Sequence, residues 1–239
     1  MLTRHYPNLS EFSYRVAPNE YEFEVGDLGS SGDHCDSQFC NHHAFASPAE
    51  LSLQQFVLRY DWLAQATNFY YAVFHVPAMI LFLVWIFIRH RDKYPQWRSS
   101  LAMLTAACLV IRYIRVAPPR FLPELGYIDL ATRFGLSVYG PVGTGVSDQF
   151  AAMPSIHVGW AAIVSLGIMF SSTSRWRWLY LLHLLITVLA VSATGNHWWL
   201  DGVAAIALLG VALAIDRFAR NITNKHPALN FANDGQSSN

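Results

Sequence analysis

One segment in the second half of the chain combines a helix start with a serine and a histidine. Residues 151–161 read AAMPSIHVGWA, and Pro154 is suited to the first turn of a helix, where its missing N–H would have no partner anyway. Ser155 and His157 then fall in the opening turn. Unpaired backbone N–H groups and the helix dipole favour an anion there. The segment therefore predicts an anion-binding helix start that carries a histidine.

A second segment places a carboxylate four residues after a histidine. Residues 194–201 read TGNHWWLD, and on a helix His197 and Asp201 would share one face. The carboxylate could accept a proton from one imidazole nitrogen and leave the other free to attack or bind. A single histidine at a helix end is more often an interfacial or hydrogen-bonded residue than a catalyst. Two such motifs together predict phosphoryl chemistry.

The composition indicates that membrane-embedded helices position these motifs. Apolar residues make up 53% of the 239 residues and charged residues only 13%, against about 25% charged residues in a soluble domain. The formal net charge is zero. We find no basic tract outside the helix flanks, which argues against a nucleic-acid partner. We expect an all-α integral membrane bundle of about five transmembrane helices with an N-terminal amphipathic helix.

The predicted transmembrane helices are five apolar runs, at about 67–88, 100–117, 155–171, 178–194 and 199–217. Before them, Ser47 begins a stretch of mixed apolar and polar residues that ends near residue 66. This stretch is predicted to form the amphipathic helix, lying in the membrane interface. His75 and Pro77, inside the first run, predict a kink with a packed histidine rather than a catalytic one.

The membrane-embedded domain is predicted to cover residues 47–220. Residues 1–46 are predicted to be an extramembrane polar segment, and residues 221–239 a polar cytoplasmic tail. Cys35 and Cys40 could form a local disulfide in an oxidising compartment or remain two free thiols. The histidines and cysteines of this segment match no zinc template, so no metal is predicted.

The longest connection runs from residue 118 to residue 152. A connection of this length predicts a functional lid or a re-entrant segment. Within it, the part from Tyr127 to Phe134 predicts a short helix on the membrane surface.

The basic residues predict the orientation of the chain. Nine of them follow the first, third and fifth runs: Arg89, Arg91, Lys93, Arg98, Arg175, Arg177, Arg217, Arg220 and Lys225. The connections on the opposite side carry only Arg120 and Arg133. Because positive loops stay in the cytoplasm, the C-terminus is predicted to be cytoplasmic and the N-terminus outside. The histidine motifs then lie on the non-cytoplasmic side of a plasma membrane or secretory-pathway membrane.

Two arginines occur within the second apolar run. Counted along a helix, Arg112 would lie near the middle of the bilayer. A lipid-facing arginine at that depth costs about 3 kcal/mol on insertion scales. Arg112 is therefore predicted to face an interior cavity, while Arg115 can extend more easily to the membrane surface.

MPSIH and GNHWWLD resemble the second and third signature motifs of the type 2 phosphatidic acid phosphatase superfamily, which also contains vanadium haloperoxidases. The closer likeness is to the branch around inositol phosphorylceramide synthase, and it extends over roughly residues 60 to 215. The resemblance implies that His197 is the nucleophile that becomes phosphorylated and that Asp201 orients it. It implies that His157 protonates the leaving oxygen and then activates the acceptor, while Ser155 holds phosphate oxygens. Neither a metal nor another cofactor is implied.

The chain departs from the superfamily pattern at two cationic positions. The first motif usually has a lysine and, six residues later, Arg-Pro, whereas here Arg120 follows two prolines and the lysine is absent. The third motif usually carries a Ser-Arg pair before its histidine, and Val191 occupies the arginine position. The resemblance thus leaves Arg120 as the cationic phosphate ligand, with Arg112 or Arg115 as possible replacements. One fewer cation suits a singly charged phosphodiester.

We therefore expect a membrane lipid phosphatase or phospho-headgroup transferase that acts through a phosphohistidine. Its substrate would be a lipid phosphoester, with water, an alcohol or a second lipid as acceptor. A non-enzymatic membrane binding or transport protein is an alternative that would use the intramembrane arginines, but it leaves the paired histidine motifs unexplained. A haloperoxidase-like relative is another alternative, because vanadate mimics phosphate, although five apolar runs argue against it.

Overall fold

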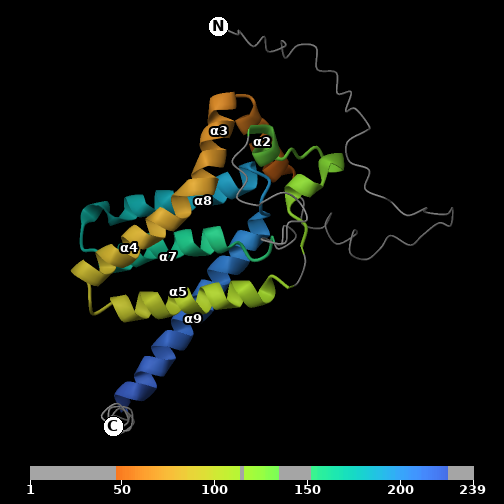
Figure 1. The fold of residues 1–239 in the computed structure, drawn as a ribbon. Helices are drawn as coiled ribbons and strands as arrows, with labels where there is room; N and C mark the ends of the chain where they lie inside the picture. The colour runs from red at the N-terminus through yellow and green to blue at the C-terminus, as the bar shows by residue number, and fades with distance from the viewer. Residues whose placement is uncertain (1–46, 114–115, 135–151, 226–239) are drawn as a thin grey trace, which may run out of the picture.

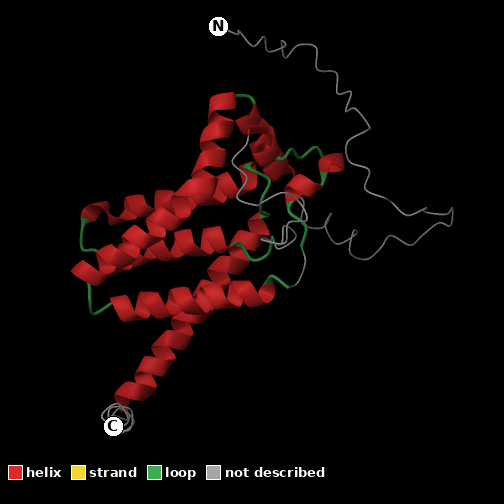
Figure 2. Cartoon of the chain, in the orientation of Figure 1, coloured by secondary structure: helices red, strands yellow, loops and turns green. Residues whose placement is uncertain are grey.

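The structure is a computed structural model that describes residues 47–113, 116–134 and 152–225. Within these ranges the regular structure is helical and no strand occurs (Figure 2). The long helical segments are α3 (Asp61–Phe69) continuing through η2 (Tyr70–Phe74) into α4 (His75–Arg89), α5 (Tyr94–Ile111), α7 (Ile156–Ser171), α8 (Leu181–Ala193) and α9 (Trp199–Lys225). The shorter ones are α2 (Pro48–Leu58), α6 (Leu130–Phe134), η3 (Pro119–Phe121), η4 (Pro123–Leu125) and η5 (Arg175–Tyr180). The expected all-α bundle is confirmed.

The helices pack around an apolar core shared by four of them. α4, α5 and α7 lie side by side, and α9 crosses α5 and extends past the other helices toward the C-terminus (Figure 1). Phe82 from α4, Leu104 from α5, Ile163 from α7 and Leu209 from α9 are all buried in this core. This core holds α7 and α9, which lie next to the histidine motifs, against α4 and α5.

Three helical segments are long and apolar enough to cross a membrane: Asp61–Arg89, Arg175–Ala193 and Trp199–Thr223. They correspond to the first, fourth and fifth predicted spans. α7 is an apolar helix of 16 residues, shorter than a usual span. The membrane crossings of α5 and α7 remain predictions. Large apolar side chains such as Leu81 and Ile215 are exposed on the outer faces, as lipid contact requires.

The segment predicted as one amphipathic helix is divided into two helices. α2 begins with a capping box between Ser47 and Glu50 and ends at Leu58, and α3 then begins at Asp61 and continues into the first span. Glu50 and Gln54 are only 2% and 0% exposed. A helix lying in the interface would direct these polar groups to water or headgroups. They instead bind backbone groups of Trp199, Ala193 and Ile128, so this face of α2 packs against the protein, while its other face is exposed.

Two further features of the helices differ from the sequence prediction. α5 begins at Tyr94, with Pro95 in its first turn, and ends at Ile111, so Arg112 caps its C-terminus and does not lie in its middle. Near His75 and Pro77, where a kink with a packed histidine was predicted, the structure has the π-helical segment η2, which ends directly before the buried His75. Pro77 has no N–H to donate to the preceding turn, which favours such a local change in hydrogen bonding.

We expect Gly167→Ala to destabilise the bundle. A Cβ atom at Gly167 in α7 would lie 2.3 Å from Cζ of the buried Phe82. Overpacking of this kind costs about 1–3 kcal/mol, more than the gain in helix propensity. Thermal unfolding in detergent micelles measures the effect. Gly210→Ala is the matched control, since nothing lies within 4 Å of its Cβ position. Equal unfolding temperatures for the two variants would contradict the packing of α7 on α4.

Candidate active site

A tight turn after α8 places His197 in the interior of the protein. Gly195 adopts a left-handed conformation with φ of 70°, as is usual for a glycine that ends a helix. The N–H groups of Asn196 and His197 then donate to the carbonyl of Val191, at 3.1 and 3.2 Å. His197 is 3% exposed and lies between the end of α8 and the start of α9. The turn therefore fixes the histidine backbone.

The hydrogen bonds of the His197 ring determine its tautomer. Nδ1 lies 2.7 Å from the carbonyl oxygen of Ala152 and 3.5 Å from Oδ2 of Asp201. A carbonyl oxygen can only accept, so Nδ1 carries the proton and Nε2 keeps its lone pair. Nε2 is buried and has no hydrogen-bond partner among the described residues. An imidazole nitrogen with a lone pair and no hydrogen-bond partner is chemically able to act as a nucleophile.

Asp201 is close to His197, although the two residues are not on one helix as predicted. His197 precedes α9, and Asp201 lies in its first turn. Asp201 Oδ2 accepts a hydrogen bond of 2.8 Å from the N–H of Trp198, which caps the start of α9. The nearest acceptor for the ring is thus the Ala152 carbonyl. The buried carboxylate, 1% exposed, is placed to stabilise a positive charge on the imidazole.

The start of α7 holds the second histidine against the first. Ser155 is the N-cap of α7, so Pro154 precedes the cap and is not in the first turn as predicted. Ser155 Oγ accepts from the N–H of Val158 at 3.4 Å, and its own N–H donates to the carbonyl of Asp201 at 3.1 Å. The Ser155 hydroxyl proton remains available for a bound oxygen. The ring centre of His157 lies 5.6 Å from that of His197.

Arg120 is attached to the same turn as His197. Its backbone N–H donates to the carbonyl of Gly195 at 2.9 Å, and its Nη1 donates to Oδ1 of Asn196. Nε lies 4.0 Å from Oδ2 of Asp129. The residue is 6% exposed. A buried cation held beside the histidine turn could bind a phosphate oxygen.

The other predicted cations lie elsewhere or outside the described residues. Arg112 is half-buried at the end of α5, and no hydrogen bond or ion pair joins its side chain to the histidines in the described part of the chain. Arg115 lies outside the described residues, as do Cys35 and Cys40. Val191, at the position of the superfamily's arginine, is buried in an apolar cluster with Tyr71 and Val158. The structure thus joins Arg120 and Ser155 to the histidine pair.

Sequence reasoning missed two polar residues of α2 that support the site. Glu50 accepts the N–H of Trp199 at the start of α9, and burial raises the pKa of its carboxyl, although hydrogen bonds from Trp199 and Ser47 oppose the shift. Gln54 Nε2 donates to the carbonyls of Ile128 and Ala193, and its Oε1 accepts the N–H of Ile128. Glu50 and Gln54 are four residues apart, so they lie on one face of α2, and this spacing could have indicated a buried polar face.

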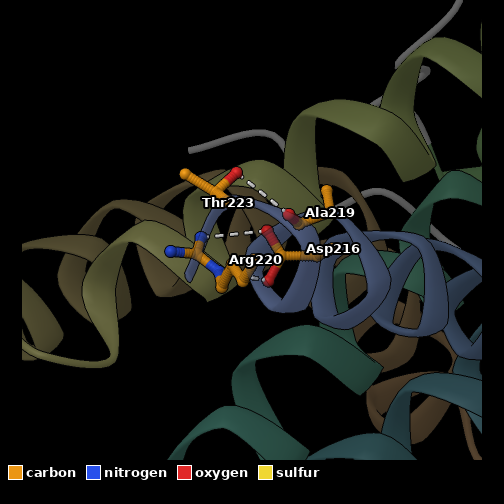
Figure 3. Close-up of a pocket in the computed structure, with 4 residues that line it drawn as sticks. All are labelled: Asp216, Ala219, Arg220 and Thr223. Carbon is orange, nitrogen blue, oxygen red and sulfur yellow. Dashed lines mark hydrogen bonds and ion pairs between the residues drawn. The ribbon is translucent and has the colours of Figure 1, made fainter. Parts of the chain in front are cut away.

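The described residues contain no group of three or more His, Cys, Asp or Glu side chains that could hold a metal ion. A surface hollow occurs on the C-terminal part of α9, lined by Asp216, Ala219, Arg220 and Thr223 (Figure 3). Asp216 and Arg220 form a two-bond ion pair there, at 2.7 and 2.9 Å. This hollow lies about four helical turns from Asp201, so it is separate from the histidines.

Comparison with known families agrees with this geometry. A family model described as the PAP2 superfamily matches residues 43–215, a range that includes Arg120, both histidine motifs and α2. The chain therefore belongs to the PAP2 superfamily, and membership in this superfamily generally indicates phosphoester hydrolase or phosphotransferase activity. Neither the curated proteins nor the solved structures gave a match.

Proposed function

We propose that this protein cleaves a lipid phosphoester through a phosphohistidine at His197 and transfers the phospho-headgroup to an acceptor. The observation that carries the proposal is the hydrogen bond between the His197 ring and the Ala152 carbonyl. Nδ1 donates to the Ala152 carbonyl, which leaves a buried lone pair on Nε2. The neighbouring cation, Arg120, would neutralise oxygens of the phosphoryl group, and Asp201 would stabilise the phosphorylated imidazole.

In the first step, His197 Nε2 would form a bond to phosphorus while the bond from phosphorus to the leaving oxygen breaks. His157 would enter this step as the imidazolium, and its Nε2 proton would pass to that oxygen, which leaves a neutral His157 ring. In the second step, the acceptor hydroxyl would give its proton back to His157 and bond to phosphorus as the N–P bond breaks. Each step then conserves charge and protons, and His157 ends in its starting state. Water as acceptor gives hydrolysis, and an alcohol or lipid gives transfer.

A phosphodiester is the substrate class that the local charge favours. Arg120 is held beside the His197 turn, and the position of the second superfamily arginine is the buried Val191. A monoester dianion carries about one more negative charge than a phosphodiester. In a buried site that extra charge would remain uncompensated, at a large desolvation cost. This agrees with the resemblance to the inositol phosphorylceramide synthase branch. We infer a phospholipid donor and a hydroxyl-bearing acceptor.

Product analysis tests the proposed function. The purified protein in mixed lipid vesicles would receive phospholipid, prenyl-phosphate and ceramide donors and acceptors, with mass spectrometry of the products. We expect release of the lipid alcohol and, with a suitable acceptor, a new phosphodiester. His197→Ala serves as the blank. A wild-type protein that converts no donor, while folded as judged by thermal unfolding, would contradict the proposal.

We further propose that the site faces the non-cytoplasmic side. Lys93, between α4 and α5, donates to the carbonyl of Phe170 at the end of α7, so two of the basic connections lie at the same end of the bundle. The positive-inside rule assigns that end to the cytoplasm. A cysteine introduced at Ala232 should react with an impermeant thiol reagent only from the cytoplasmic side. Labelling of Ala232→Cys from the outside only would contradict the proposed orientation and favour the opposite one.

A further inference from the structure

One glutamine of α2 joins two segments that come from distant parts of the chain. Gln54 is completely buried, and α2 packs against α8 (Figure 1). Its Oε1 accepts the N–H of Ile128 at 2.9 Å, and its Nε2 donates to the carbonyls of Ile128 at 2.9 Å and Ala193 at 3.1 Å. These bonds use both amide protons of the side chain. The side chain therefore links the segment directly before α6 to the end of α8.

Each of the two joined segments also holds Arg120. In the segment before α6, Oδ2 of Asp129 lies 4.0 Å from Arg120 Nε. In the turn after α8, the carbonyl of Gly195 accepts the Arg120 N–H at 2.9 Å, and Asn196 accepts a hydrogen bond from the guanidinium. Gln54 thus ties together the two sets of groups that fix the position of this cation.

The turn that carries His197 packs closely on both Gln54 and Arg120. A Cβ atom at Gly195 would lie 3.1 Å from Nε2 of Gln54 and 3.3 Å from Cβ of Arg120. Both distances are shorter than an ordinary van der Waals contact of about 3.5–4.0 Å, so the two residues lie directly against the same glycine. A change at Gln54 would therefore act where the turn that carries the nucleophile meets the cation.

We propose that Gln54 is a positioning residue that sets the place of Arg120 relative to His197. This inference rests on the proposed function, in which the guanidinium neutralises phosphoryl oxygens while His197 Nε2 bonds to phosphorus. Such stabilisation requires the cation at a fixed distance from the reacting atoms, and small displacements lower the rate strongly. The three hydrogen bonds of Gln54 join it to backbone groups, so it acts on the reaction through Arg120.

The chemistry of the three partners requires an amide side chain. One N–H group and two carbonyl oxygens face it, which calls for one acceptor and two donors at a single position. A glutamate could still accept the N–H of Ile128, but its ionised form has no proton for the carbonyls and its protonated form has only one. A methionine has a similar length and no donor. Both substitutions therefore weaken the link between the segments while largely keeping the side-chain volume.

Double-mutant kinetics on a nitrophenyl phosphodiester tests the inference. We expect Gln54→Met to lower kcat about tenfold with little change in KM, because the cation acts mainly in the transition state. In an Arg120→Met background, Gln54→Met should cause no further loss, whereas in a His157→Ala background the loss of about tenfold should persist. Gln54→Glu keeps the bond to the Ile128 N–H, so it should show the same pattern with a smaller loss. Gln55→Met, at the exposed neighbouring position of α2, is the matched control and should retain normal kcat.

Three results would decide against the inference. An equal further loss in both backgrounds, a change in KM alone, or the same loss in Gln55→Met would make Gln54 a structural residue only. The folded fraction of each variant, from thermal unfolding, normalises kcat, and Gln54→Glu carries the comparison if Gln54→Met does not fold. These outcomes leave the proposed function intact when the wild type cleaves the ester and His197→Ala does not. A wild type that cleaves no ester would overturn the proposed function and this inference with it.

Discussion

Replacing His197 by alanine should abolish cleavage of every phosphoester that the wild type accepts. The Nε2 lone pair is the proposed nucleophile, and without it no covalent intermediate forms on alkyl or nitrophenyl esters. We expect at least a thousandfold loss of kcat on both. His90→Ala is the matched control, because His90 lies at the C-terminal end of α4, where its ring packs on Trp85. Steady-state kinetics in lipid vesicles measures both variants.

His157→Ala should give a different pattern. Removal of a general acid costs about 10²–10⁴-fold when the leaving oxygen needs a proton and much less when the leaving group is already stable. The variant should therefore be severely impaired on an alkyl ester and recover in part on a nitrophenyl ester. If His157→Ala were inactive on both esters and His197→Ala recovered on the activated one, the two histidine roles would be exchanged.

Replacing Arg120 by methionine should lower turnover about 10²–10³-fold. Its buried guanidinium is held by Asn196 and Asp129, and a positioned cation of this kind acts mainly on the charge that develops in the transition state. Arg120→Lys keeps the charge but loses the planar fork, so we expect an intermediate loss. The assay is kcat on the same phosphodiester, together with the thermal unfolding temperature.

The control for this series is Arg133→Met. Arg133 lies in α6, 39% exposed, with an ion pair of 3.9 Å to Asp61. Because exposed ion pairs contribute little, its replacement should change neither activity nor stability much. Arg112→Met, assayed alongside, tests the remaining predicted phosphate ligand. Normal turnover in Arg120→Met would mean that Arg112 or Arg115 supplies the phosphate-binding charge.

The sequence predicted the helical bundle and singled out residues that the structure brings close together. The low fraction of charged residues and the apolar runs led to a helical membrane bundle, and the two motifs led to His157, His197 and Asp201. The alternation of spans brought Arg120 to the same end of the bundle, and the structure joins it to the His197 turn. These features depend on periodicity and topology, which a sequence records directly.

The features that the sequence did not predict depend on tertiary contacts. The acceptor for His197 is the backbone carbonyl of Ala152, and a backbone group has no signature in a sequence. Glu50 appeared to belong to an interfacial helix because its partner, the N–H of Trp199, lies 149 residues further along the chain. The predicted second span began at residue 100, which placed Arg112 near its middle. In the structure α5 begins at Tyr94, because Pro95 is compatible with the first turn of a helix, and Arg112 therefore lies at its C-terminal end.

Direct mapping of the covalent intermediate tests the central claim most sharply. The protein would be mixed with a nitrophenyl phosphodiester, quenched in alkali, in which phosphohistidine survives, and digested for mass spectrometry. We predict a phosphoryl adduct on the peptide that contains His197, absent from His197→Ala and increased in His157→Ala, which lacks the base for the second step. An adduct on His157 or Ser155, with His197 unmodified, would contradict the account.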